Sequence, residues 1–285
     1  MRYSFIRFPN GRPKALTLSY DDGCAEDIRF ADLLAKYGIK CTFNFVSNTF
    51  TKERSLPTEQ VKEHILGNGH EIAVHGSHHK ALGIVRPIDG IRDVLDCRTE
   101  LENRYGRIIR GMAYPESGIT KFANEASYQN IKSYLTELGI VYSRTLAGDN
   151  NSFELPQDWH AWMPTAHHDN PKIYEYVDEF LSFDYSQKKY RMARPRLFYL
   201  WGHSYEFEMK NNWEHIEAIC EKLANKDDIW YATNIEVYEY VNAYNSLIRS
   251  ADGRMIYNPT LIKIWFVGDG KPYTIEPGET IIIDE

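Results

Sequence analysis

The sequence LTLSYDDG at residues 16–23 decides the fold, because it places a short buried strand directly before two acidic side chains. Apolar and small polar residues alternate along it, as they do in a β-strand. Neighbouring carboxylates at Asp21 and Asp22 repel each other, so stability alone does not explain them. Gly23 allows a turn of positive φ and close approach to the backbone. The simpler alternative is that Asp22 caps a helix that begins near Ala25.

A second short strand ends in histidines. In GHEIAVHGSHH, residues 69–79, the apolar run 72–74 precedes His75 and His79. Their spacing of four would place both imidazoles on one face of a helical turn. Such a pair is a weak indication alone, because the chain has ten histidines. Together with the acidic pair, however, two histidines and one carboxylate form a donor set for a catalytic Zn²⁺ or a similar divalent ion.

Apolar strands and amphipathic helices alternate from Ala15 to about Asn245, which indicates a parallel α/β arrangement. In an α/β barrel, catalytic groups sit at the carboxyl ends of the strands. The last part of the chain differs, with short apolar runs between Gly and Pro turns. We therefore expect a barrel over residues 1–250 and a small β-rich C-terminal appendage over residues 251–285, with a structural role favoured over carbohydrate binding for the appendage.

The composition excludes several classes of protein. The net charge of −7 and the lack of a Lys/Arg block argue against nucleic acid or an anionic membrane as a partner. The N-terminus lacks an apolar targeting segment, so we expect a cytoplasmic protein. The four cysteines lie far apart and fit reduced thiols better than disulfides: Cys24, Cys41, Cys97 and Cys220.

The two motifs together resemble those of the polysaccharide deacetylases, the NodB-homology carbohydrate esterases. SYDDG at residues 19–23 is similar to the family's first motif, Thr-Phe-Asp-Asp-Gly, and His75 and His79 match the second. Gly76 stands where the family usually has a hydroxyl residue, and the hydroxyl moves to Ser77. The resemblance covers about the first 245 residues and implies a distorted (β/α)7-type barrel.

The resemblance also implies roles for these residues. Asp21 would be the catalytic base, and Asp22, His75 and His79 would hold a divalent metal ion. Zn²⁺ is favoured, and Co²⁺ or Mn²⁺ suit the same donors. The sequence LWGH at residues 200–203 is similar to the fifth motif of the family. His203 would then be the general acid, with Leu200 or Trp201 shaping a pocket for the acetyl methyl group.

The remaining motifs are matched more loosely. RGMAYP at residues 110–115 is similar to the third motif, which makes Arg110 the partner of Asp21 and the backbone amide of Tyr114 the oxyanion donor. Glu116 follows the proline, where Tyr or Gly is more usual, and would line the sugar site.

Asp158 and Trp159 stand for the fourth motif. Asp158 would steer His203, and Trp159 would contact the sugar. His167, His168 and Asp169 resemble a further metal cluster. Because they lie in a loop with no second element at ligand spacing, a solvated or substrate-lining role is favoured over a second metal.

These expectations combine into one function: metal-dependent hydrolysis of N-acetyl groups, or less readily O-acetyl groups, on a carbohydrate. A metal-free hydrolase of cyclic amides is one alternative, but such relatives tend to lose ligands of the first two motifs. A non-catalytic carbohydrate-binding protein is another, and it would require loss of the base or acid. Asp21 and His203 are both present.

Overall fold

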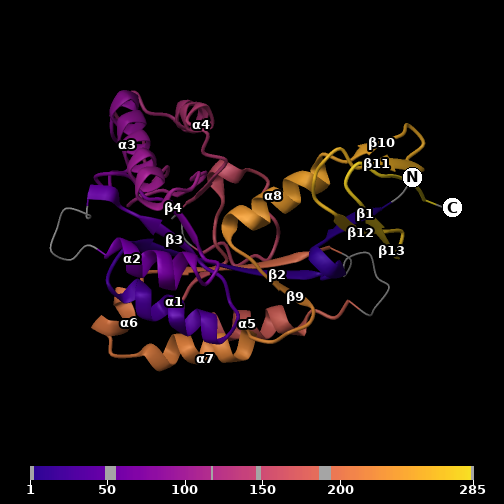
Figure 1. Cartoon of the computed structure of the whole chain (residues 1–285), viewed down its shortest axis with the longest axis horizontal. Helices are drawn as coiled ribbons and strands as arrows, with labels where there is room; N and C mark the ends of the chain where they lie inside the picture. Colours follow the sequence, from indigo (N-terminus) through magenta and orange to yellow (C-terminus); the bar gives the residue numbers. More distant parts are fainter. Residues whose placement is uncertain (1–2, 49–55, 117, 146–148, 186–193, 284–285) are drawn as a thin grey trace.

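The computed structural model describes residues 3–48, 56–116, 118–145, 149–185 and 194–283. Its centre is a curled parallel sheet of eight strands, seven in the order β6-β5-β4-β3-β2-β8-β7 and β9 paired with β2 (Figure 1). The expected distorted (β/α)-type barrel is thereby confirmed, with the sheet curled into a half-barrel. The strands are β2 (Lys14–Asp22), β3 (Thr42–Phe45), β4 (Glu71–Val74), β5 (Gly111–Ala113), β6 (Tyr142–Arg144), β7 (Ala166–His167), β8 (Arg196–Gly202) and β9 (Ile229–Tyr231).

Strand β2 organises the sheet. It pairs with β8 from Lys14 to Tyr20. Two strands pair with the other edge of β2. Residues 14–16 of β2 pair with β9, and residues 19–22 pair with β3. All of these pairings are parallel, so the carboxyl ends of β2, β3, β4 and β8 meet at one edge of the sheet.

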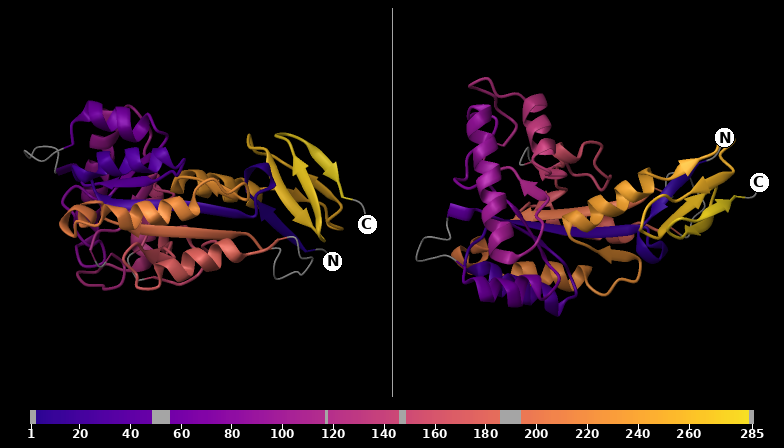
Figure 2. Two further views of the ribbon diagram at one scale, coloured as in Figure 1. Left: turned by 90° about the horizontal axis from the view of Figure 1, so that it is seen from below. Right: turned by 45° about the horizontal axis from the view of Figure 1, so that its top comes forward.

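Helices cover the sheet on both sides (Figures 1 and 2). Amphipathic α1 packs near α6, and α5 packs against α7, whereas α3 and α4 lie together elsewhere on the sheet. The apolar residues between these helices and the strands form the main core. The helices are α1 (Glu26–Lys36), α2 (Thr58–Gln60) with the π-helical turn η3 (Val61–Leu66), α3 (Pro87–Tyr105), α4 (Tyr128–Glu137), α5 (Ile173–Ser182), α6 (Tyr205–Met209), α7 (Trp213–Leu223) and α8 (Asn234–Asn245).

Two small antiparallel sheets pack at the far end of the molecule from α6, next to α8 (Figure 2). One contains β10 (Ile248–Arg249), β11 (Met255–Tyr257) and β14 (Thr280–Ile282). The other contains β1 (Ser4–Arg7), β12 (Ile264–Gly268) and β13 (Lys271–Ile275).

The short strands expected after residue 250 do form β-sheets, but one of these sheets includes β1 from far earlier in the chain. Strand β1 pairs with β12 and not with the barrel. The division of the chain at residue 250 stays a prediction, and this pairing crosses it. Among the described residues, no helix is both long and apolar enough to span a membrane.

Candidate metal centre and active site

Strand β2 delivers the two adjacent carboxylates to different environments. Asp21 is completely buried and accepts a hydrogen bond of 2.8 Å from Asn44 Nδ2 on β3. The backbone then turns sharply, because Asp22 and Gly23 both have positive φ, at 81° and 70°. Asp22 is partly exposed. It does not cap α1, whose first turn receives no side-chain cap from its N-cap residue Ala25.

Asp22 meets the two predicted histidines. Its Oδ1 lies 3.5 Å from His75 Nε2 and 3.4 Å from His79 Nε2. His75 Nδ1 donates to the Ala113 carbonyl oxygen at 2.9 Å, which leaves its Nε2 facing Asp22. Ligands about 2.1 Å from a tetrahedral Zn²⁺ lie about 3.4 Å apart. The three donors therefore fit a divalent ion of this size in both chemistry and spacing.

The loop that presents these histidines is not the expected helical turn. Residues 75–79 follow β4 as irregular backbone, with positive φ at Gly76 and His79. A Cβ on Gly76 would lie 2.4 Å from Asp93 Oδ2, so a hydroxyl residue would not fit there. Asp93 instead accepts a hydrogen bond from the backbone N–H of His78 at 2.7 Å. This explains why the sequence has glycine at position 76.

The surroundings of Asp22 and His75 favour the forms of these two side chains that bind metal. Burial raises the pKa of Asp22, but its interactions with His79, His75 and His203 outweigh that effect and bring the pKa below its ordinary value. Burial lowers the pKa of His75, whereas the interaction with Asp22 raises the pKa of His79. At neutral pH Asp22 is an anion and His75 is neutral, the states that bind metal.

Arg144, not Arg110, is the partner of Asp21. The Arg144 guanidinium is completely buried at the end of β6 and forms an ion pair with Asp21. Arg110 precedes β5, so it lies at the opposite end of the strands, where it pairs with Glu239 at 3.0 Å near the surface. The prediction for Arg110 is therefore wrong. The available indication for Arg144 was the short apolar run at residues 140–142, which ends two residues before it.

His203 lies beside the metal-binding group, with its Nε2 3.9 Å from Asp22 Oδ2. Its Nδ1 contacts Glu206 Oε1 at 3.1 Å, so Glu206 orients the ring. Burial acts to lower the pKa of His203, but Glu206 and the charges of Asp21 and Asp22 hold it above its ordinary value. Sequence analysis missed Glu206, although its place three residues after His203 on α6 was an indication.

Asp158 does not steer His203. Its carboxylate accepts hydrogen bonds from Tyr128 and Lys132, and also from the backbone of His160 at the start of η4 (Trp159–Ala161). It is therefore a helix cap and a surface ion pair. The neighbouring Trp159 packs against Trp162 and against Tyr238 of α8, in the second core cluster, so it does not lie with the predicted sugar-contacting groups.

The predicted oxyanion donor is already engaged. The backbone N–H of Tyr114 donates to the Arg144 carbonyl oxygen at 2.9 Å, as part of the pairing between β5 and its neighbour. The Tyr114 hydroxyl is buried and donates to His160. That assignment is wrong, because this amide belongs to the sheet. Glu116 is exposed and acts electrostatically on His79, which agrees with a place at the rim of the site.

The two pocket candidates on β8 point in different directions, since side chains alternate along a strand. Leu200 is fully buried in the main core between the sheet and the helices. Trp201 faces the site, because the Arg144 guanidinium lies 4.7 Å from its ring centre and the His203 ring centre lies 6.0 Å away. Trp201 thus keeps the predicted position, and Leu200 does not.

A curled parallel sheet that gathers carboxylates and histidines at its carboxyl edge has the organisation of (β/α)-barrel proteins, whose functional sites lie there. Comparison with known families agrees: residues 9–134 match the model described as polysaccharide deacetylase. This part of the chain is thus similar to the polysaccharide deacetylase family. No curated protein matches the sequence.

Solved structures show the same fold at low sequence identity. A probable polysaccharide deacetylase from Pseudomonas aeruginosa aligns at a TM-score of 0.58 and 13% identity, over 81% of this chain and 92% of that one. A polysaccharide deacetylase from Mycobacterium smegmatis, described as putative, aligns at a TM-score of 0.57 and 15% identity, over 88% of this chain and 99% of that one. A mutant of the peptidoglycan deacetylase PdaC from Bacillus subtilis aligns at a TM-score of 0.53 and 15% identity, over 84% of this chain and 96% of that one.

Proposed function

We propose that this protein is a metal-dependent hydrolase that removes N-acetyl groups, or less readily O-acetyl groups, from a carbohydrate. The observation that carries the proposal is the convergence of Asp22, His75 and His79 into one donor group, with Asp21 and His203 on either side. The family match over residues 9–134 supports acetylated carbohydrate as the substrate class.

Asp22, His75 and His79 would hold the metal ion. A divalent ion bound there lowers the pKa of a water molecule and polarises an acyl carbonyl. The chain prepares these ligands in advance, because the Ala113 carbonyl fixes the tautomer of His75 and the positive φ of Asp22 turns its carboxylate toward both rings.

Asp21 would accept the proton of the attacking water. Its Oδ2 lies 3.8 Å from His75 Nε2, beside the metal ligands. Arg144 forms an ion pair with the buried carboxylate and Asn44 donates a hydrogen bond to it, so both compensate its charge. Asp21 and Asp22 can therefore divide the work of base and ligand.

His203 would donate a proton to the leaving nitrogen when the C–N bond breaks, which releases acetate and the free amine. Glu206 holds the ring and stabilises its charged form, as a general acid requires. Trp201 stands next to His203 and over Arg144, where its ring would contact the acetyl group.

The test is acetate release from an oligomer of N-acetylglucosamine by the zinc-loaded protein. Asp21→Asn should abolish turnover while zinc remains bound, since the three ligands are intact. His64→Gln is the matched control, because His64 is partly exposed and pairs with Asp32 away from the site. Full activity of Asp21→Asn would refute Asp21 as the base.

The two alternatives give different results in the same experiment. A metal-free hydrolase of cyclic amides would open a cyclic amide after chelation and release no acetate. A carbohydrate-binding protein would bind the oligomer without turnover in the wild type as well as in Asp21→Asn.

A further inference from the structure

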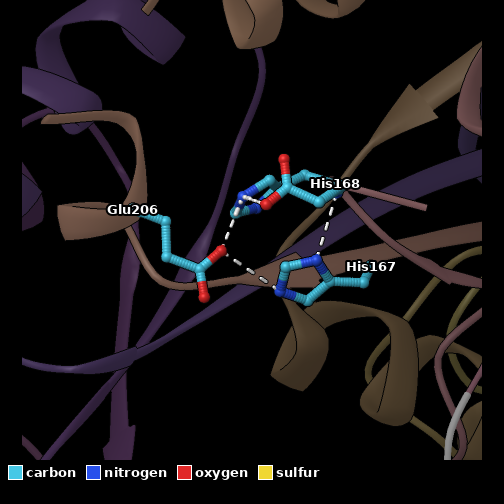
Figure 3. A group of neighbouring side chains, drawn as sticks. His167, His168 and Glu206 are labelled. Carbon is cyan, nitrogen blue, oxygen red and sulfur yellow. Dashed lines mark hydrogen bonds and ion pairs between the residues drawn. The ribbon is translucent and has the colours of Figure 1, made fainter. Parts of the chain in front are cut away.

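A second group of possible ligands lies on the other side of His203. His167, His168 and Asp169 lie at the end of β7, and Glu206 approaches them from α6 (Figure 3). In sequence the histidines lacked a partner at ligand spacing, because Glu206 lies far from them along the chain. The fold supplies that second element.

The distances within this group match those of metal ligands. His168 Nε2 lies 2.9 Å from Glu206 Oε2 and 3.5 Å from Asp169 Oδ2. The ligands of a tetrahedral Zn²⁺ lie about 3.4 Å apart. His168 is completely buried, and apart from their mutual contact neither its Nε2 nor Glu206 Oε2 has a hydrogen-bond partner among the described residues. A cation bound beside both atoms would satisfy them together.

The fold prepares His168 to ligate through Nε2. Its Nδ1 lies 3.2 Å from the Tyr20 hydroxyl, which can accept the ring proton and leave Nε2 free. The ring fits only because residue 202 is glycine, since a Cβ there would lie 2.0 Å from His168 Nδ1.

His167 orients a ligand and is not itself one of the proposed ligands. Its Nδ1 accepts a hydrogen bond of 3.1 Å from the backbone N–H of Asp169, so the neutral ring carries its proton on Nε2. That nitrogen lies 3.5 Å from Glu206 Oε2 and can orient the carboxylate. The direct ligands are therefore one imidazole and two carboxylates: His168, Asp169 and Glu206.

Lys210 now balances the two carboxylates. Its ammonium group contacts Asp169 and lies 3.7 Å from Glu206 Oε2. Half of the Lys210 side chain is exposed, so it can turn into solvent when a cation takes its place. Lys210 is thus a built-in competitor for any cation at these ligands.

We propose that His168, Asp169 and Glu206 form a second divalent-cation site, separate from Asp22, His75 and His79. Glu206 links the two regions, because its Oε2 belongs to the second site while its Oε1 holds His203. A cation bound there fixes Glu206 and, through it, the position of the His203 ring. The site goes beyond the proposed deacetylase function and does not depend on it.

The experiment measures Zn²⁺ binding by the full chain in the His75→Ala background, which disables the first site. Isothermal titration and metal analysis should find one ion per chain. Adding His168→Phe should abolish it, and this change keeps an aromatic ring against Phe207, 4.4 Å away. No bound zinc in His75→Ala, or equal binding with and without His168→Phe, would overturn the proposal.

A second variant keeps the test decisive if His168→Phe does not fold. Lys210→Met in the His75→Ala background removes the competing ammonium group and its two ion pairs, and should tighten Zn²⁺ binding severalfold. The matched control is Lys222→Met, since Lys222 is similarly exposed and pairs with Asp178 elsewhere. If Lys210→Met leaves the affinity unchanged, the ion does not bind at Asp169 and Glu206, and the proposal fails. Loss of deacetylase activity plays no part in these readouts, so failure here is distinguishable from failure of the proposed function.

Discussion

Replacement of Arg144 by methionine should destabilise the protein far more than the same replacement of Arg110. Arg144 and its partner Asp21 have side chains that are 0% and 1% exposed. Removing one member of a buried ion pair leaves an uncompensated charge and typically costs about 3–5 kcal/mol. Asn44 still donates a hydrogen bond to Asp21 in the variant, so we expect a value near the lower end, about 3 kcal/mol.

Arg110 provides the matched control. It forms an ion pair too, with Glu239, but the two side chains are 38% and 47% exposed. Exposed pairs of this kind contribute about 0–1 kcal/mol. The two Arg→Met variants should therefore differ by at least about 2 kcal/mol in free energy of unfolding.

Urea unfolding at pH 7, followed by circular dichroism and tryptophan fluorescence, measures both variants. In an Asp21→Asn background, Arg144→Met should lower the free energy of unfolding only a little, or even raise it, because no buried anion is left to compensate. Equal costs for Arg144→Met and Arg110→Met, or an undiminished cost in the Asp21→Asn background, would refute the reasoning that Arg144 compensates Asp21.

Three further changes test other parts of the molecule. Burial raises the pKa of Asp27 from its ordinary value of 3.8 to about 8, so the folded protein keeps a proton that the unfolded chain has lost between these values. Unfolding releases that proton, so the free energy of unfolding should fall as the pH rises from about 4 to about 8. Asp27→Asn should flatten this pH dependence in thermal melts. An unchanged slope in the variant would contradict the role of Asp27. His203→Gln should lower kcat roughly 10²–10⁴-fold, and Glu206→Gln by a smaller factor, with KM nearly unchanged in steady-state acetate release; normal kcat for both would exclude His203 as the acid. Gly202→Ala would press a methyl group against His168 and should cost about 1–3 kcal/mol in urea unfolding, whereas a stable variant would show that the ring moves freely.

The sequence was sufficient to predict the residues that directly follow a strand with a clear apolar pattern. Asp21, Asp22 and His75 stand at such positions, and the parallel arrangement then brings them together. His79 was found as well, although by a spacing argument that assumed a helical turn where the structure has a loop.

The misassigned residues belong to interactions that sequence spacing does not determine. Arg110 and Arg144 stand at opposite ends of neighbouring strands, and only the register of β5 with β6 shows which of them faces Asp21. In the same way, sequence alone does not show whether Asp158 or Glu206 supplies the carboxylate that contacts His203. The path of the chain after β8 decides that Glu206 reaches His203.

The pairing of β1 with β12 has a consequence for how the chain is made. Ser4 is synthesised 264 residues before its partner Gly268. Until β12 emerges, β1 has an unpaired edge with nothing in the sheet beside it. Such distant contacts slow the final folding step. We therefore expect nascent chains halted before residue 264 to be protease-sensitive in β1, even when the strands around Asp21 have already assembled.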